Sequence, residues 1–430
     1  MILFDTPPWI MGITLFLFGA CIGSFLNVCI YRLPQHEDVW RAWSGLGHPP
    51  STCPYCRTRI LWYDNIPVLG WLFIGGRCRF CRHRISFRYP LIELLNGLLW
   101  VGLYLAIVPA GYTAQLSESS LATPLGPLSA DMPHRDLVFW LHVQYAYFLV
   151  LAEALVVASF IDFDLQIIPD SVTLPAMIVG LLGSLTGRVY LTPVWFQDPE
   201  VLTAFWELFL APGQPVPVWM QIAVPAWCRS WPLVHGLMVS LTGLVVGGGI
   251  VWFVRIAGQW VFRREAMGFG DVILMAMIGS FLGWQATVVV FFLAPMCALV
   301  TVAATWLFSR QREIPFGPYL SLAALLVLFG WQTLFEATER CFGLGPYLPV
   351  LGLLMSGLLV AVLWIVQGLK WVLGIPLYDA EWGGEWTSAD QLTYIANRDP
   401  DAGRGGLAPR EWPGAAAGRG VLHQKRWLGR

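Results

Sequence analysis

Met267-Gly268-Phe269-Gly270-Asp271 opens an apolar run in which Asp271 is the only charged residue before Arg310. Placing a carboxylate where the chain enters a bilayer is costly, so an acid in this position marks a functional site by default. The two glycines lack a Cβ, which lets the backbone adopt positive φ or approach another segment closely. The stretch therefore predicts a membrane helix that begins at a functional carboxylate, with Gly268 and Gly270 shaping the backbone beside it.

A partner for Asp271 lies in segment 159–170, SFIDFDLQIIPD, which ends one apolar run and precedes another. This segment supplies three acids, Asp162, Asp164 and Asp170. Two carboxylates that share a site cannot both ionise cheaply, so one stays protonated and acts as the acid while the other activates water. The pattern predicts aspartic-protease chemistry.

Simpler interpretations of these acids stay open at this point. Asp271 alone could be an N-cap carboxylate that accepts backbone hydrogen bonds where a helix begins. For Asp164 the expectation is a solvated loop charge. For Asp170 it is the N-cap of a helix that begins at Ser171.

Composition sets the class of protein. Of the 430 residues, 57% are hydrophobic and only 12% are charged, whereas soluble domains average about a quarter charged residues. The sequence therefore predicts an all-α polytopic membrane protein with about eight to nine transmembrane helices. The formal net charge of −1 gives no electrostatic case for binding nucleic acid.

The distribution of arginine predicts the orientation in the membrane. Residues 32–88 contain nine arginines, which by the positive-inside rule places this segment in the cytoplasm. Following the spans from there puts Asp162 and Asp271 at the same, cytoplasmic face. The predicted organisation is a first transmembrane helix (1–31), a cytoplasmic zinc-binding domain (32–88), a membrane peptidase domain (89–375) with external loops near 109–137 and 186–231, and a polar, disordered tail (376–430).

Two cysteine pairs in the cytoplasmic segment predict a metal site. Cys53-Pro54-Tyr55-Cys56 and Cys78-Arg79-Phe80-Cys81 are separated by residues 57–77. Each pair can present two thiolates to one ion, so Cys53, Cys56, Cys78 and Cys81 are expected to hold a structural zinc. Four thiolates leave no open position for substrate. The alternative is four unconnected thiols in a reducing compartment.

Taken together, these motifs resemble the type IV prepilin peptidases, a bifunctional family of aspartic membrane proteases that are leader peptidases and N-methyltransferases. The resemblance rests on GSFLNV (23–28), YRLP (31–34), the cysteine pairs around YDNIP (63–67), ISFRYP (85–90) with Glu93, Ile161-Asp162, GFGD (268–271) and PFGP (315–318). It implies that Asp162, the first acid of its cluster, pairs with Asp271 as the catalytic dyad.

The resemblance also implies substrates, a cofactor and a location. The substrates would be type IV prepilins or pseudopilins of a pilus or secretion system, cut after a glycine at the cytoplasmic face of the bacterial inner membrane. The new amino terminus would then be methylated from S-adenosylmethionine. The residues that bind the methyl donor are unknown, because the sequence has no glycine-rich nucleotide loop of the Rossmann kind.

Two other functions are weighed against this one. The first is another intramembrane aspartic protease, of the signal-peptide or archaeal preflagellin type, which the cysteine pairs argue against. The second is a membrane scaffold or proton-coupled transporter that uses the same carboxylates. Against it, both acids are expected at one face rather than at the midplane, and the sequence shows no inverted repeat.

Overall fold

A computed structural model describes residues 7–373, with gaps at 37, 48–50, 54, 109–132, 211–213, 263–266 and 307–314. Most of the predicted external loop at 109–137 and the whole predicted tail from 376 lie outside the described residues. The described chain is helical, and its only β structure is two isolated bridges, Thr52–Arg59 and Arg77–Arg84.

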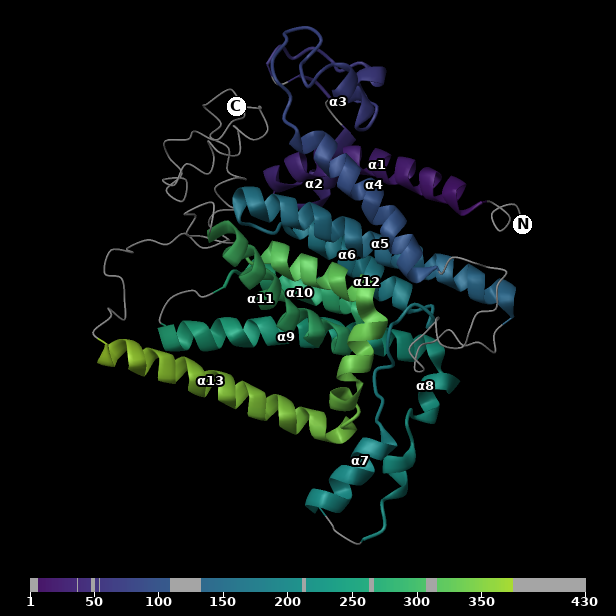
Figure 1. Cartoon of the computed structure of the whole chain (residues 1–430), viewed down its shortest axis with the longest axis vertical. Coiled ribbons are helices and arrows are strands. Elements are labelled where there is room, and N and C mark those ends of the chain that lie inside the picture. Colours follow the sequence, from purple (N-terminus) through teal and green to yellow (C-terminus); the bar gives the residue numbers. More distant parts are fainter. Residues whose placement is uncertain are drawn as a thin grey trace.

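Among the described residues, nine apolar helices form the body of the protein (Figure 1). They are α1 (Pro8–Arg32), α4 (Arg88–Ile107), α5 (His134–Leu165), α6 (Asp170–Ser184), α9 (Pro232–Phe262), α10 (Phe269–Leu282), α11 (Trp284–Trp306), α12 (Gly317–Phe342) and α13 (Leu348–Val372). Seven are long and apolar enough to cross a membrane, while α6 and α10 are shorter. The predicted count of eight to nine is therefore reached only when these two are included.

Short helices fill the connections. The segment between α1 and α4 holds η2 (Leu33–Gln35), α2 (Val39–Ser44), η3 (Gly45–Gly47), η4 (Trp62–Asn65) and α3 (Leu69–Phe73). The segment between α6 and α9 holds α7 (Pro199–Phe205), η5 (Trp206–Leu210), η6 (Val218–Gln221) and α8 (Ala226–Ser230), and η7 (Gly345–Tyr347) precedes α13.

Helix α10 is the centre of the bundle (Figure 1). Every residue from Val272 to Leu282 except Ile273 is buried. It packs most closely on α9, where a Cβ added to Gly243 would lie 2.0 Å from the carbonyl oxygen of Gly279. Small residues at such crossings let membrane helices approach closely. Because α10 is enclosed in this way, its first turn, which carries Asp271, is held inside the protein.

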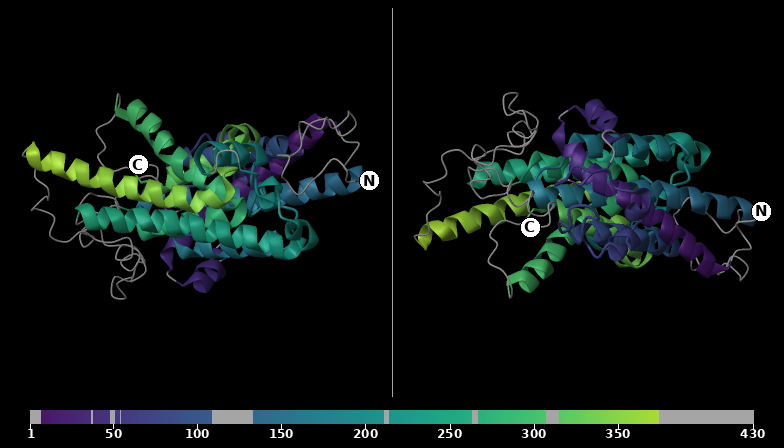
Figure 2. Two further views of the ribbon diagram at one scale, coloured as in Figure 1. Left: turned by 90° about the horizontal axis from the view of Figure 1, so that it is seen from below. Right: turned by 90° about the horizontal axis from the view of Figure 1, so that it is seen from above.

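Helix α13 lies on the outside of this bundle. It runs alongside α9 (Figure 2). No residue in the most apolar 18-residue stretch of this helix is buried in the protein. Its apolar surface therefore matches a helix that faces lipid.

The ends of α5 and α6 differ from what was expected of Asp164 and Asp170. Helix α5 continues to Leu165, so Asp162 and Asp164 both lie in its last turn. The turn closes at Gln166, which has a left-handed backbone (φ 55°, ψ 40°). Helix α6 begins at Asp170 after Pro169, and no side chain caps it, so the prediction that Asp170 is an N-cap is wrong.

The predicted external loop at 186–231 is a packed unit. Leu202 and Met220 in this segment are fully buried. The backbone N–H of Asp198 donates to the carbonyl of Gly343, which joins the unit to the end of α12. Its many apolar residues therefore pack against each other and against the bundle as well as lying at the surface.

Candidate active site

The two predicted catalytic acids lie next to each other in the fold. Asp162 comes from the last turn of α5, and Asp271 from the first turn of α10. Their exposed fractions are 5% and 9%, so both carboxyl groups are largely removed from water. Their segments meet at Ile168: a Cβ added to Gly317, which lies against Asp162, or to Gly270, which precedes Asp271, would lie 3.0 or 3.1 Å from an atom of Ile168. This arrangement, two buried carboxyls on separate helices, is what a shared-proton pair requires.

Asp162 is enclosed by the start of α12. A Cβ added to Gly317, the first residue of that helix, would lie 2.6 Å from Oδ2 of Asp162 and 3.0 Å from Cδ1 of Ile168. Oδ2 itself has no hydrogen-bond partner among the described residues. A buried polar atom without a partner calls for an explanation, and a water or substrate group bound there during catalysis would supply one.

The interpretation of Asp271 as an N-cap is wrong. Gly268 is the N-cap of α10, which makes Asp271 the third helical residue rather than the cap. In this first turn the backbone N–H groups have no partner within the helix, and their dipoles stabilise a negative charge.

The two glycines of the GFGD stretch have different roles. Neither has a positive φ, and Gly268 has the ordinary extended backbone of an N-cap (φ −68°, ψ 151°). A Cβ at Gly270 would lie 3.1 Å from Cβ of Ile168, closer than most real contacts. Gly270 therefore serves close approach, bringing the start of α10 against the segment that follows Asp162.

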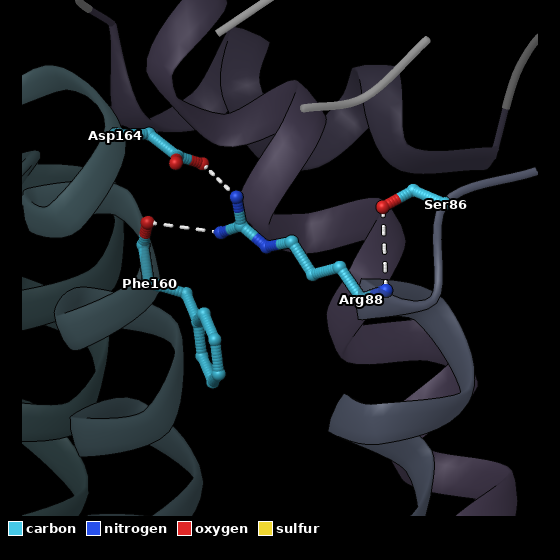
Figure 3. Close-up of polar contacts among 4 residues, drawn as sticks. All are labelled: Ser86, Arg88, Phe160 and Asp164. Atoms are coloured by element: carbon cyan, nitrogen blue, oxygen red, sulfur yellow. Dashed lines mark hydrogen bonds and ion pairs between the residues drawn. The ribbon is translucent and has the colours of Figure 1, made fainter. Parts of the chain in front are cut away.

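The expectation that Asp164 is a solvated loop charge is wrong. Asp164 is buried in the last turn of α5, and its Oδ2 lies 2.5 Å from Nη1 of Arg88 (Figure 3). The other guanidinium nitrogen, Nη2, donates to the carbonyl of Phe160 at 3.1 Å. The sequence predicts an exposed charge because it does not show that α4 brings Arg88 to this place.

Sequence reasoning missed the contributions of Gly317, Ile168 and Arg88. Gly317 and Arg88 belong to the PFGP and ISFRYP motifs that carried the family resemblance, but no role followed from them. A glycine at the start of an apolar run, in the sequence Pro315-Phe316-Gly317-Pro318, is the available signal for close backbone approach. Nothing in the sequence indicated which side chain it would approach.

The four cysteines of segment 32–88 form one cluster. Their sulfur atoms all lie within 4.8 Å of one another. Two separations are 3.7 Å (Cys53 to Cys81) and 3.9 Å (Cys56 to Cys78). A tetrahedral ion with Zn–S bonds of about 2.3 Å holds its sulfur atoms about 3.8 Å apart. The cluster therefore has the geometry of a metal site.

The two cysteine turns have the same backbone. The N–H of Cys53 donates to the carbonyl of Thr58, and the N–H of Cys78 donates to the carbonyl of His83. The residue after each second cysteine, Arg57 or Arg82, has a left-handed backbone with φ of 56° or 59°. Each turn thus directs its pair of thiols to one side.

The cysteine cluster is connected to the membrane helices. Arg79 forms a two-point ion pair with Asp64, with Nε–Oδ2 and Nη2–Oδ1 distances of 2.8 and 2.5 Å, and its guanidinium lowers the pKa of Asp64. Four residues later, the backbone N–H of Val68 donates to Glu93 of α4 at 2.7 Å. Val68 has φ 59°, a strained value for a β-branched residue, so the Glu93 contact helps to hold this turn.

Comparison with known proteins identifies the family. The model of the bacterial peptidase A24 N-terminal domain matches residues 17–107, and that of the type IV leader peptidase family matches residues 217–303. A prepilin leader peptidase/N-methyltransferase of Aeromonas hydrophila is 31% identical over 341 residues, covering 75% of this chain and 91% of the relative. This chain belongs to the type IV leader peptidase family.

Further relatives agree with membership of the leader peptidase family. A prepilin leader peptidase/N-methyltransferase of Dickeya chrysanthemi is 31% identical over 76% of this chain and 97% of its own length. A type 4 prepilin-like proteins leader peptide-processing enzyme of Escherichia coli O78:H11 is 28% identical over 76% of this chain and 96% of its own. No solved structure matches the chain.

As a type IV leader peptidase, the chain is a multi-pass enzyme of the bacterial inner membrane. Membership of this enzyme family decides against the alternatives of a membrane scaffold or a proton-coupled transporter. Asp271 lies within the stretch that matches the leader peptidase model, whereas Asp162 lies between the two matched stretches. The proximity of Asp162 to Asp271 is therefore an observation from the structure that is independent of the family match.

Proposed function

We propose that this leader peptidase cleaves the leader of type IV prepilins or pseudopilins with Asp162 and Asp271 as its catalytic pair. The observation that carries the proposal is the meeting of these two buried carboxyls from α5 and α10. The relatives named above are prepilin leader peptidases, which supports the substrate class.

The chemistry follows from a pair of carboxyls that share one proton. The ionised carboxylate takes a proton from water as the water oxygen attacks the scissile carbonyl carbon. The protonated carboxyl gives its proton to the carbonyl oxygen, and a tetrahedral intermediate forms. When the C–N bond breaks, the carboxyl that accepted the water proton gives it to the leaving amide nitrogen. A hydroxyl of the tetrahedral intermediate returns its proton to the other carboxylate as the C=O bond re-forms, so the dyad again holds a single proton.

The position of the pair suits a substrate whose apolar helix stays in the bilayer. Asp162 lies at the end of α5 and Asp271 at the start of α10, and the positive-inside rule places these ends at the cytoplasmic face. A prepilin whose basic leader stays in the cytoplasm and whose following segment is apolar presents its cleavage site at this level.

The test is a cleavage assay with a defined product. The purified full-length protein is incubated in detergent with several type IV prepilins, and the product's amino terminus is read by mass spectrometry with and without S-adenosylmethionine. We expect cleavage directly after a leader glycine. Failure to cleave any of several prepilins would contradict the proposal.

We also propose that the four-cysteine cluster holds one structural zinc ion. The sulfur separations of 3.7 and 3.9 Å support a tetrahedral site, and the segment around it has little core of its own. Bound zinc would join Cys53 and Cys56 to Cys78 and Cys81 and so stabilise the fold of residues 32–88.

For metal analysis of the purified protein, we expect about one zinc per chain. The double variant Cys56→Ser/Cys81→Ser should lose the metal, lower the melting temperature and expose residues 51–88 to protease. Cys21→Ser, a change at an exposed cysteine of α1, is the control and should keep the zinc. Wild-type protein with well under one metal ion per chain would rule the zinc site out.

Methylation of the new amino terminus is the second proposed activity. The names of the relatives support it, since they pair the peptidase with an N-methyltransferase. S-adenosylmethionine would supply the methyl group, and we assign no residue to its binding. A mass gain of one methyl group that depends on S-adenosylmethionine is the expected result. Cleavage without that gain would limit the proposal to the peptidase.

A further inference from the structure

Arg88 connects α4 to the part of α5 that carries Asp162 (Figure 3). Its Nη1 pairs with Asp164 at 2.5 Å, its Nη2 donates to the carbonyl of Phe160 at 3.1 Å, and its Cζ lies 5.0 Å from the centre of the Phe160 ring. The contacted residues stand two positions before and two positions after Asp162. The ion pair is buried, with side-chain exposures of 11% for Arg88 and 1% for Asp164.

Arg255 makes a similar connection on the other side of the pair. It lies on α9, its Nε donates to the carbonyl of Met267 at 3.0 Å, and its Cζ lies 5.7 Å from the centre of the Phe269 ring. Met267 precedes the N-cap of α10, and Phe269 is two positions before Asp271. In the segment around each acid, a backbone carbonyl and an aromatic ring are therefore contacted by an arginine from a neighbouring helix.

These contacts are made at the ends of the two helices, where the backbone is least stabilised by hydrogen bonds within the helix. Asp162 is in the last turn of α5 and Asp271 in the first turn of α10, where backbone groups lack partners within the helix. Catalytic groups must be held to within about 0.5 Å of their working positions. A guanidinium suits this task because its planar array of donors can bind a carbonyl and a carboxylate together while its face rests on a ring.

We propose that Arg88 and Arg255 are positioning residues that fix Asp162 and Asp271 relative to each other. The proposal rests on the peptidase function proposed above. Neither arginine takes part in the proton transfers. Arg88 has a second effect, because it balances the buried charge of Asp164 two residues from the dyad.

The variants must remove the contacts without leaving a charge buried alone. Arg88→Met/Asp164→Leu replaces the whole ion pair by apolar side chains, a change that is often neutral for stability. Arg255→Met keeps the apolar stem and removes the guanidinium. Arg188→Gln is the matched control, because Arg188 also lies over an aromatic ring, that of Trp140 at 5.3 Å. Trp140 lies in the first part of α5, whereas Asp162 is in its last turn, and Arg188 follows the end of α6 that is opposite Ile168.

Two measurements are made on the full-length protein in detergent. The first is hydrogen–deuterium exchange of segments 160–168 and 267–272, which does not depend on any substrate. The second is the kinetics of prepilin cleavage, with kcat and KM determined separately. We expect faster exchange in 160–168 for the Arg88→Met/Asp164→Leu protein and in 267–272 for Arg255→Met. We expect kcat to fall about 10- to 100-fold, with KM little changed, at an unaltered melting temperature.

The outcomes separate this proposal from the peptidase function. Unchanged exchange in both segments overturns the positioning role, whatever the activity. Wild-type kcat in both variants overturns it as well. A kcat that falls only together with the melting temperature also overturns it, because general destabilisation then explains the loss. If the wild-type protein cleaves no prepilin, the proposed peptidase function fails, and exchange alone decides whether the arginines hold the two segments.

Discussion

Replacement of Asp162 or Asp271 by asparagine is expected to lower kcat for prepilin cleavage by about 10³-fold or more, because an amide keeps the shape of the side chain but cannot exchange the proton. Each carboxyl has a separate part in the reaction, so either single variant should lose nearly all activity. Initial rates of leader release, followed by mass spectrometry of the product, measure the effect.

The control for this prediction is Asp136→Asn. Asp136 lies on the same helix as Asp162 but in its first turn, where it is exposed. This variant should cleave at the wild-type rate. Normal processing by either the Asp162→Asn or the Asp271→Asn protein would show that the dyad is wrongly assigned. An unchanged melting temperature for both variants is needed to attribute the loss to chemistry.

Gly317→Ala is expected to produce the second large loss, about 10²-fold in kcat. The added methyl group would lie 2.6 Å from Oδ2 of Asp162, which is too close for a carbon and an oxygen, so the carboxyl or the start of α12 must move. The backbone itself is not the obstacle, since Gly317 has no positive φ. The loss should therefore appear in kcat more than in KM.

Gly249→Ala is the matched control for Gly317→Ala. Gly249 lies on α9, is exposed, and has no atom within 4 Å of the position of an added Cβ. Alanine there should leave cleavage unchanged. If Gly317→Ala cleaved prepilin with the wild-type kcat, the close enclosure of Asp162 by α12 would have no part in catalysis.

The sequence anticipated much of this site, with two errors at helix ends. Asp271 at the start of an apolar helix and the four-cysteine cluster were both predicted, and the structure has both. Asp164 was expected in solvent and Asp170 at a helix cap, and both expectations were wrong. The Asp164 error assumed that α5 ends before this acid, whereas the helix continues to Leu165. The Asp170 error placed the start of α6 one residue too late, since Pro169 is its N-cap.

The sequence by itself determined the membrane class, a carboxylate near the start of the apolar helix α10 and the four-thiol cluster. These depend on local properties: the length of apolar runs, the cost of a charge in a bilayer and the spacing of cysteines within a turn. Only the tertiary structure decided that Gly317 encloses Asp162, that Gly270 lies against Ile168, and that Arg88 binds Asp164, 76 positions away. Such contacts depend on how α4, α5, α10 and α12 pack together. The sequence pattern of one segment predicts the local structure of that segment, but it does not show which distant residues will pack against it.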